Sequence, residues 1–178
     1  MKATLRIPAP ETECGYKEIE VDITEEELTK LAEPPKTSKL TGYERVEKDN
    51  TYHYVNSHGD VFWLREDCDT CDDSYYDTAN YYSSKLVAEN NARADQLMRQ
   101  LRRFAVEHRD EDMDWSNDVT EKYYIEYNYD NGELLPDSYC IFRTFGAIYF
   151  DSFESAQAAI NAFHDELIWY FTEYKDSL

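Results

Sequence analysis

The sequence feature that most constrains the fold is the pattern of residues from Tyr123 to Tyr174. Aromatic and β-branched residues run from 123 to 129, an Asp-Asn-Gly turn signal follows at 130–132, and the segment 138–143 reads as a return strand. Gly146 permits a tight bend before a continuously apolar stretch that ends at Phe150. These features predict an antiparallel meander of three strands.

A long helix is predicted directly after this meander. Asp151 and Ser152 carry side-chain oxygens that can cap its first turn. Apolar residues then recur at three- and four-residue spacing, which is typical of an amphipathic helix. They are Ala156, Ala159, Ile160, Phe163, Leu167, Tyr170 and Phe171. The pattern predicts a helix over about 152–173 that covers one face of the sheet.

A second long helix is predicted over about 84–108. Ser83 and Ser84 can cap it, and its apolar positions again recur with helical spacing. Upstream, the apolar segments 51–55 and 61–64 flank a cluster of Asn, Gly and Asp residues and so predict a β-hairpin. The sequence therefore predicts an α+β fold, with antiparallel sheets packed against two long amphipathic helices.

The N-terminal residues predict a small ββα subdomain. The two strands are expected at 2–7 and 16–23, and Thr24 with the glutamates after it forms a capping signal for a short helix. The segment 34–41 begins with two prolines and reads as a linker. The predicted organisation is thus a subdomain at 1–33, a linker at 34–41 and an α+β core domain at 42–178.

The chain is strongly acidic throughout its length. It has 38 acidic and 18 basic residues in 178, a formal net charge of −20. Acidic residues outnumber basic ones in each third of the sequence, so the excess is not confined to a tail. A charge of this size repels nucleic acid and anionic membrane surfaces and favours a basic partner. It also serves solubility alone, and that explanation stays open.

Two dense acidic runs are the candidate partner-binding residues. Each is expected to form a loop that can reach into a groove of a partner. The first comprises Glu66, Asp67, Asp69, Asp72, Asp73 and Asp77, with no basic residue among them. The second comprises Asp110, Glu111, Asp112, Asp114 and Asp118. Dense carboxylates displayed on a rigid protein resemble the charge of a nucleic-acid backbone, which basic proteins bind through Lys and Arg.

The sequence carries no catalytic signature. It contains no Gly-x-Ser-x-Gly motif, no glycine-rich phosphate loop and no evident partner for any of its four histidines. Nor do the acidic runs contain the Asp-x-Asp-x-Asp-Gly pattern of a calcium loop. We therefore expect a protein that is not an enzyme and that uses no cofactor and no metal.

One metal-binding alternative remains open. Cys68 and Cys71 have the CxxC spacing of half a zinc site, which Cys14, Cys140, His53 or His58 would have to complete. A single CxxC without a second pair is weak support for zinc. The alternative is therefore a CxxC-based metal-binding accessory protein.

The chain also resembles a group of known proteins. The resemblance lies in the segments 41–48, 52–60, 80–84 and 146–152. It is to small acidic accessory proteins carried by phages and mobile elements of Gram-positive gut bacteria, and some acidic phage proteins of this size act as anti-CRISPR inhibitors. The resemblance implies a viral protein in a counter-defence setting, and it assigns no functional residue. Because the sequence has no N-terminal apolar run of signal-peptide length and nowhere eighteen consecutive apolar residues, we expect the protein to work in the cytoplasm of the bacterial host cell.

Together, charge and resemblance predict an anti-CRISPR protein. It would bind and inhibit an RNA-guided CRISPR nuclease by presenting an acidic, DNA-mimicking surface that blocks target DNA. An alternative is an inhibitor or adaptor of another basic DNA-binding protein, such as a restriction enzyme. The predicted partner is in either case a basic nucleic-acid-binding protein, with no direct nucleic-acid or membrane binding, and the protein itself would be a monomer or a homodimer.

Overall fold

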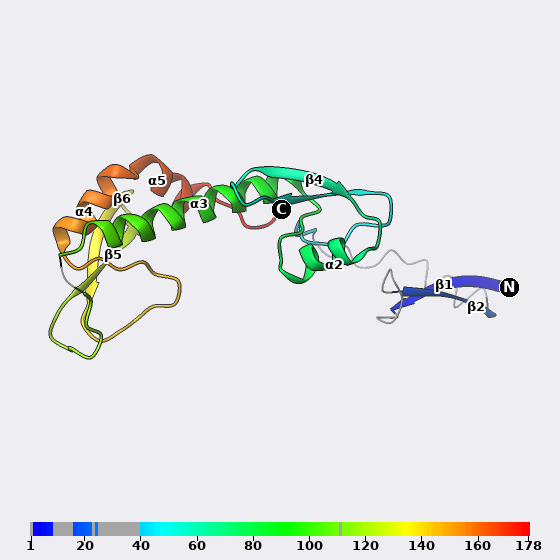
Figure 1. Ribbon diagram of the computed structural model, residues 1–178, viewed down its shortest axis with the longest axis horizontal. Coiled ribbons are helices and arrows are strands. Elements are labelled where there is room, and N and C mark those ends of the chain that lie inside the picture. The colour runs from blue at the N-terminus through cyan, green and yellow to red at the C-terminus, as the bar shows by residue number, and fades with distance from the viewer. Residues whose placement is uncertain (1, 9–15, 23, 25–39, 111) are drawn as a thin grey trace. The chain divides into compact units, whose positions relative to one another are not determined.

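The computed structural model describes residues 2–8, 16–22, 24, 40–110 and 112–178. Within these residues the chain divides into two compact units, Met1–Glu89 with Asp176–Leu178, and Asn90–Lys175. Figure 1 shows the elements of both units along the chain. The described elements are four helices and three two-stranded antiparallel sheets, so the predicted α+β class is confirmed.

The first unit contains two β-hairpins. β1 (Lys2–Pro8) pairs with β2 (Tyr16–Asp22), and β3 (Thr51–Val55) pairs with β4 (Val61–Arg65). All four strands match the predicted positions to within a residue. The helix predicted after Thr24 and residues 34–39 of the linker lie outside the described residues, so this boundary stays a prediction.

The β3–β4 hairpin turns where the Asn/Gly/Asp cluster predicted it. The Asn56 side-chain oxygen accepts the backbone N–H groups of His58 and Asp60, each at 2.9 Å. Gly59 takes a φ of +92°, which an L-residue rarely adopts. The turn is therefore specified by local side-chain chemistry.

The first unit is completed by helix α2 (Thr70–Asp77) and the start of α3 (Lys85–Glu107). Its small apolar core gathers Tyr82, Val87 and Ala88, with Tyr43, Val55 and Val61 packed around them. The rings of Tyr52 and Tyr81 stack beside it with centroids 3.9 Å apart. Tyrosine thus supplies much of the buried surface of a thin sheet.

The second unit holds the rest of α3, which matches the predicted helix, together with a hairpin and two helices. β5 (Lys122–Asn128) pairs with β6 (Glu133–Tyr139), and α4 (Phe153–Ala162) and α5 (His164–Thr172) follow. Its core consists of residues from α3, α4 and α5 around Phe150. They are Leu97, Leu101, Ala105, Phe150, Ala156, Ala159, Ile160 and Leu167.

The return strand predicted at 138–143 is misplaced. β6 begins at Glu133, because the register pairs Asn128 directly with Glu133 across the turn. The stretch 133–136 contains glutamate and proline, which are depleted in strands, so the residue preferences of this stretch did not predict a strand there. Pro136 is accommodated because β6 lies at the edge of a two-stranded sheet.

The third strand predicted before Phe150 is a single bridge. Tyr123 and Phe150 exchange two backbone hydrogen bonds, of 2.9 and 2.7 Å, and no further pairing extends from them among the described residues. The predicted helix over 152–173 is also divided, since Phe163 has a φ of −121° and a ψ of 22° between α4 and α5. The Phe163 ring packs edge-on against Phe104 at 5.6 Å, a tertiary contact that helical spacing does not reveal.

Gly42→Ala should destabilise the first unit by about 2–4 kcal/mol. Gly42 has a φ of +94°, and an added Cβ would lie 2.6 Å from Val87 Cγ2, inside van der Waals contact. The free energy of unfolding is measured by amide hydrogen exchange in urea, with each unit followed by its own peptides.

Gly146→Ala is the matched control for this steric effect. Gly146 has a similar φ of +83°, but an added Cβ would meet no atom within 4 Å. Its unit should lose only the conformational part, about 1–2 kcal/mol. Equal losses for the two variants would show that the contact with Val87 is relieved without cost.

Candidate partner-binding surfaces

The first acidic run contains a helix, so the prediction of a loop over 66–77 is wrong for Thr70–Asp77. Asp69 is the N-cap, and its carboxylate accepts the backbone N–H groups of Cys71 and Asp72 at 2.8 and 3.0 Å. The Asp72 side chain accepts the Asp69 N–H in return, at 3.2 Å, which completes a capping box. Carboxylates at a helix N-terminus also oppose the positive end of its dipole. These acids therefore begin a helix.

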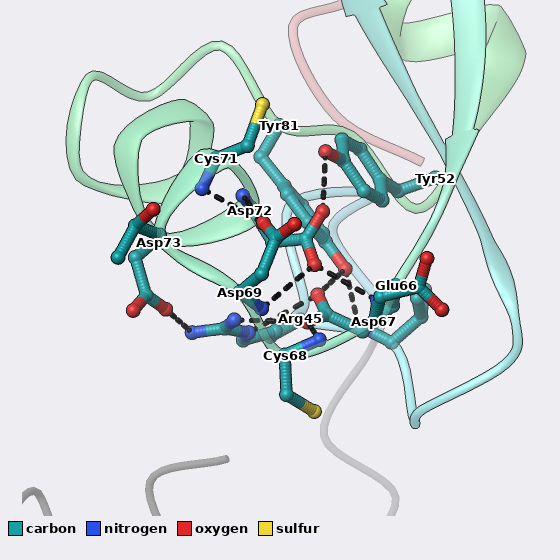
Figure 2. Close-up of polar contacts among 12 residues, drawn as sticks. Arg45, Tyr52, Glu66, Asp67, Cys68, Asp69, Cys71, Asp72, Asp73 and Tyr81 are labelled. Carbon is teal, nitrogen blue, oxygen red and sulfur yellow. Dashed lines mark hydrogen bonds and ion pairs between the residues drawn. The ribbon is translucent and has the colours of Figure 1, made fainter. Parts of the chain in front are cut away.

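Glu66 lies inside the first unit with 1% of its surface exposed. Its carboxylate accepts Arg45 Nη2 at 2.9 Å, Arg45 Nε at 3.2 Å, the Tyr81 hydroxyl at 2.7 Å and the Cys68 N–H at 3.0 Å (Figure 2). A buried carboxylate is tolerated only when it is paired and hydrogen-bonded. The side chain is thus a structural centre of this unit and cannot contact a partner.

Asp72 is buried in the same way, with 3% of its surface exposed. Its carboxylate accepts the Tyr52 hydroxyl at 2.8 Å and the backbone N–H groups of Asp67 and Asp69 at 2.8 and 3.2 Å. Burial by itself raises the pKa of Asp72, but these hydrogen bonds outweigh it and hold the pKa below its usual value. Burial and the bond to Asp72 raise the pKa of the Tyr52 hydroxyl, which stays a donor.

The remaining carboxylates of the first run are exposed or partly exposed, and two of them are neutralised. Asp73 pairs with Arg45 Nη1 at 2.7 Å, and Asp67 pairs with Arg65 Nη2 at 3.0 Å. The expectation of one exposed acidic run is therefore wrong for Glu66 and Asp72, because both side chains are buried. Asp69 and Asp77 are exposed, and Asp69 is occupied in capping α2.

Sequence reasoning missed the partners of this buried network. Arg45 lies 21 residues before Glu66, and Tyr52 lies 20 residues before Asp72. The signals that could have found them are an isolated arginine ahead of the hairpin and tyrosines on its strands. No spacing rule connects such positions, because the β3–β4 hairpin brings them together.

The second acidic run lies in the second unit and is exposed. Asp110, Asp112, Asp114 and Asp118 all lie at the surface, and Glu111 lies outside the described residues. The Asp112 side chain is 97% exposed, with Arg109 Nη2 at 3.3 Å. Asp114 accepts the Ser116 hydroxyl and N–H at 2.6 and 2.8 Å, and these bonds lower the pKa of its carboxyl. This run matches the predicted acidic loop in placement.

The second run borders a hollow of about 420 Å³ on the surface of its unit. Five acidic residues are part of its lining, namely Asp110, Asp112, Asp114, Glu121 and Asp151. Of the five, Glu121 and Asp151 were not among the predicted residues. Glu121 precedes β5, and Asp151 precedes α4, so the fold brings three separate segments to one place.

Lys122 is the cation among the residues that line this hollow, and it is not available at the surface. It is 1% exposed, and its Nζ donates to the carbonyl oxygens of Asn117 and Cys140 at 2.6 and 3.2 Å. The Trp115 ring lies 5.5 Å from the same ammonium group. The ammonium group of Lys122 is thus bound to backbone oxygens, and the other charged residues of the lining are all acidic.

The CxxC pair does not converge on a common point. Cys68 has a left-handed φ of 58° and Cys71 lies in the first turn of α2, and their side chains point to opposite sides of the Glu66 network in Figure 2. Among the described residues, no group of three or more His, Cys, Asp and Glu side chains is placed to hold a metal ion. Cys14 lies outside those residues.

Comparisons of this chain with models of protein families, with curated proteins and with solved structures find no match. Its helices, as far as the structure describes them, include none with the length and apolar character needed to cross a membrane.

Glu66→Gln should lower the free energy of unfolding of the first unit by about 2–4 kcal/mol. The change removes the buried negative charge that faces Arg45, while the size of the side chain is kept. Asp67→Asn is the control, because its ion pair with Arg65 is exposed and should contribute about 1 kcal/mol or less. The free energy of unfolding of both variants is measured by hydrogen exchange in urea. A larger loss of stability for Asp67→Asn than for Glu66→Gln would contradict the structural role assigned to Glu66.

Tyr52→Phe should shift acid unfolding of the first unit to higher pH. A lowered carboxyl pKa stabilises the fold above about pH 4, and that contribution is lost as the pH falls through the folded-state pKa. Removing the Tyr52 hydroxyl lets the pKa of Asp72 rise, and should cost about 1–2 kcal/mol at neutral pH. Stability is measured by urea unfolding from about pH 2 to 7.

Tyr76→Phe is the control for the Tyr52 variant. The Tyr76 side chain is 43% exposed. Among the hydrogen bonds of the described residues, none joins Tyr76 to Asp72. Its acid unfolding should match that of the unchanged protein. The same acid midpoint for both tyrosine variants would refute the role assigned to the Tyr52 hydroxyl.

Proposed function

We propose that this protein binds the cationic cleft of a nucleic-acid-binding protein and competes there with nucleic acid. The observation that supports this most is the second acidic run: its four described acidic residues are all exposed, and Asp110, Asp112 and Asp114 line a hollow with five acidic residues in its lining. Basic clefts bind nucleic acid largely through neutralisation of phosphate charge, and an array of fixed carboxylates can substitute for that charge.

The local charge balance supports this surface over the first run. In the first unit, Arg45 and Arg65 pair with carboxylates of the first run, and Glu66 and Asp72 are buried. In the second unit, Lys122 is buried under the hollow, and Arg109 is the ion-pair partner of Asp112. Among the described residues, Asp110, Asp114 and Asp118 are exposed and have no ion pair within 4 Å, and the proposed contacts are Asp110, Asp112, Asp114 and Asp118.

The net charge of −20 gives the second run a long-range role as well. A field of this size steers a basic partner toward the protein and opposes association between two copies. Salt screens such a field, with a Debye length of about 10 Å at 0.1 M. Binding by this mechanism is therefore strongest at low salt.

The proposed target is an RNA-guided CRISPR nuclease, and the protein is then an anti-CRISPR inhibitor. Such nucleases hold guide and target strands in positively charged channels and read a short duplex motif with arginines. The choice of this target depends on the resemblance to acidic phage proteins, and the acidic surface fits other basic proteins equally. A restriction enzyme is the alternative, which the same binding assay with that enzyme distinguishes.

The experiment measures target-DNA binding by a guide-loaded type II nuclease with increasing amounts of this protein. We expect the protein to block DNA binding at about 50 mM salt and to lose most of this effect by about 500 mM. Inhibition that stays constant over this range would exclude an electrostatic mechanism.

Replacing Asp110, Asp112, Asp114 and Asp118 together with asparagine should weaken inhibition by about tenfold or more. Asparagine keeps a side-chain acceptor, so the turn at Ser116 is preserved. A control variant replaces Asp60, Asp95, Asp130 and Asp176, which are exposed elsewhere, and changes the net charge by the same amount. Equal loss in the two variants would mean that net charge, and not this surface, carries the inhibition.

A further inference from the structure

The loop after β6 exposes apolar side chains that have no role in the core. Ile141 is 64% exposed, Phe142 is 62% exposed and Phe145 is fully exposed. Val119, at the end of the second acidic run, is 80% exposed. Large aromatic side chains at this level of exposure, gathered in one short loop, are typical of protein interaction sites.

The backbone of this loop is held in place by contacts within the second unit. The Thr144 N–H donates to the hydroxyl of buried Tyr149 at 2.8 Å. The Arg143 guanidinium lies over the Trp115 ring at 5.1 Å, and the Phe142 ring packs edge-on against Tyr139 at 5.9 Å. Figure 1 shows this gold-coloured loop extending away from α4 and α5. The exposed rings are therefore presented from a supported loop.

The same buried lysine connects the apolar loop to the acidic one. Lys122 donates to the carbonyl of Asn117 in the acidic segment and to that of Cys140 in the apolar loop. Cys140 Sγ also lies 3.6 Å from the Val119 carbonyl oxygen. The acidic segment and the apolar loop are thus joined through Lys122 and Cys140 within the second unit.

We infer that Phe142 and Phe145 insert into an apolar pocket at the edge of the partner's cationic cleft. This inference rests on the proposed function and adds a property of the partner, namely an apolar pocket bordered by Lys or Arg. Binding energy in protein interfaces is concentrated in a few aromatic anchors, while surrounding charges guide the encounter. The loop supplies the anchors and the second acidic run supplies the charges.

Charge complementarity decides which partner this surface fits. A second copy of this chain would bring an identical set of carboxylates next to the first, which opposes self-association. An anionic membrane surface is disfavoured for the same reason. A basic protein surface with an apolar pocket satisfies both halves of the site.

The test uses two synthetic peptides of equal positive charge. One alternates lysine and serine over 16 residues, and the other replaces four of the serines with leucine or tryptophan. Dissociation constants for the unchanged protein are measured by fluorescence anisotropy at about 50 mM salt. The mixed peptide should bind about tenfold or more tightly than the charge-only peptide.

Two double variants show whether the loop causes this difference. Phe142→Thr with Phe145→Thr should abolish the preference for the mixed peptide and leave binding of the charge-only peptide unchanged. Phe62→Thr with Trp63→Thr removes exposed aromatics of β4, 48% and 67% exposed, and should keep the preference. Phe145→Thr alone, at a fully exposed position, should give a partial loss without affecting the fold.

The outcomes separate this inference from the proposed function. Equal affinity of the unchanged protein for both peptides would overturn the apolar anchor while leaving charge-driven binding in place. A preference that survives Phe142→Thr with Phe145→Thr would also overturn it. Failure to bind either peptide at low salt would overturn the proposed function, and the anchor with it.

Discussion

The structure depends on the requirement that a charge removed from water must be paired. In the first unit the buried Glu66 carboxylate holds Arg45, Tyr81 and the start of the segment leading into α2. In the second unit the buried Lys122 ammonium holds two loops through their carbonyl oxygens. Each unit has thin, two-stranded sheets, so these interactions fix loops that a larger apolar core would otherwise have to position.

The two buried charges have opposite consequences for the surface. Glu66 removes an acidic group from the surface and recruits Arg45, which also pairs with Asp73. Lys122 keeps its ammonium group below the surface, bonded to backbone oxygens, and among the described carboxylates of the second run Asp112 alone has an ion-pair partner, Arg109. The four described carboxylates of the second run are all exposed, whereas the first run has two of its carboxylates buried. The proposed binding face thus follows from the interior as well as from the count of acidic residues.

Aromatic residues contribute to both the core and the proposed interface. Tyr52 and Tyr81 are buried and stack on one another while their hydroxyls serve the buried carboxylates. Phe142 and Phe145 instead face solvent in the loop after β6. Composition reports only that the chain is rich in aromatic residues. Their division between core and surface depends on where the hairpins and the loop after β6 place each ring.

The sequence by itself determined the α+β class, both N-terminal strands, the β3–β4 hairpin and α3, because periodicity, turn residues and caps act within a few positions. It also determined the acidic charge and the exposed second run. Tertiary structure alone decided that Glu66 and Asp72 are buried, since their partners lie 21 and 20 residues away across a hairpin. Tertiary structure also decided that the last helix breaks at Phe163, that β6 begins at Glu133, and that Glu121 and Asp151 lie at the hollow. Each of these depends on contacts between segments that are far apart in the sequence, and the sequence pattern within one segment does not reveal such contacts.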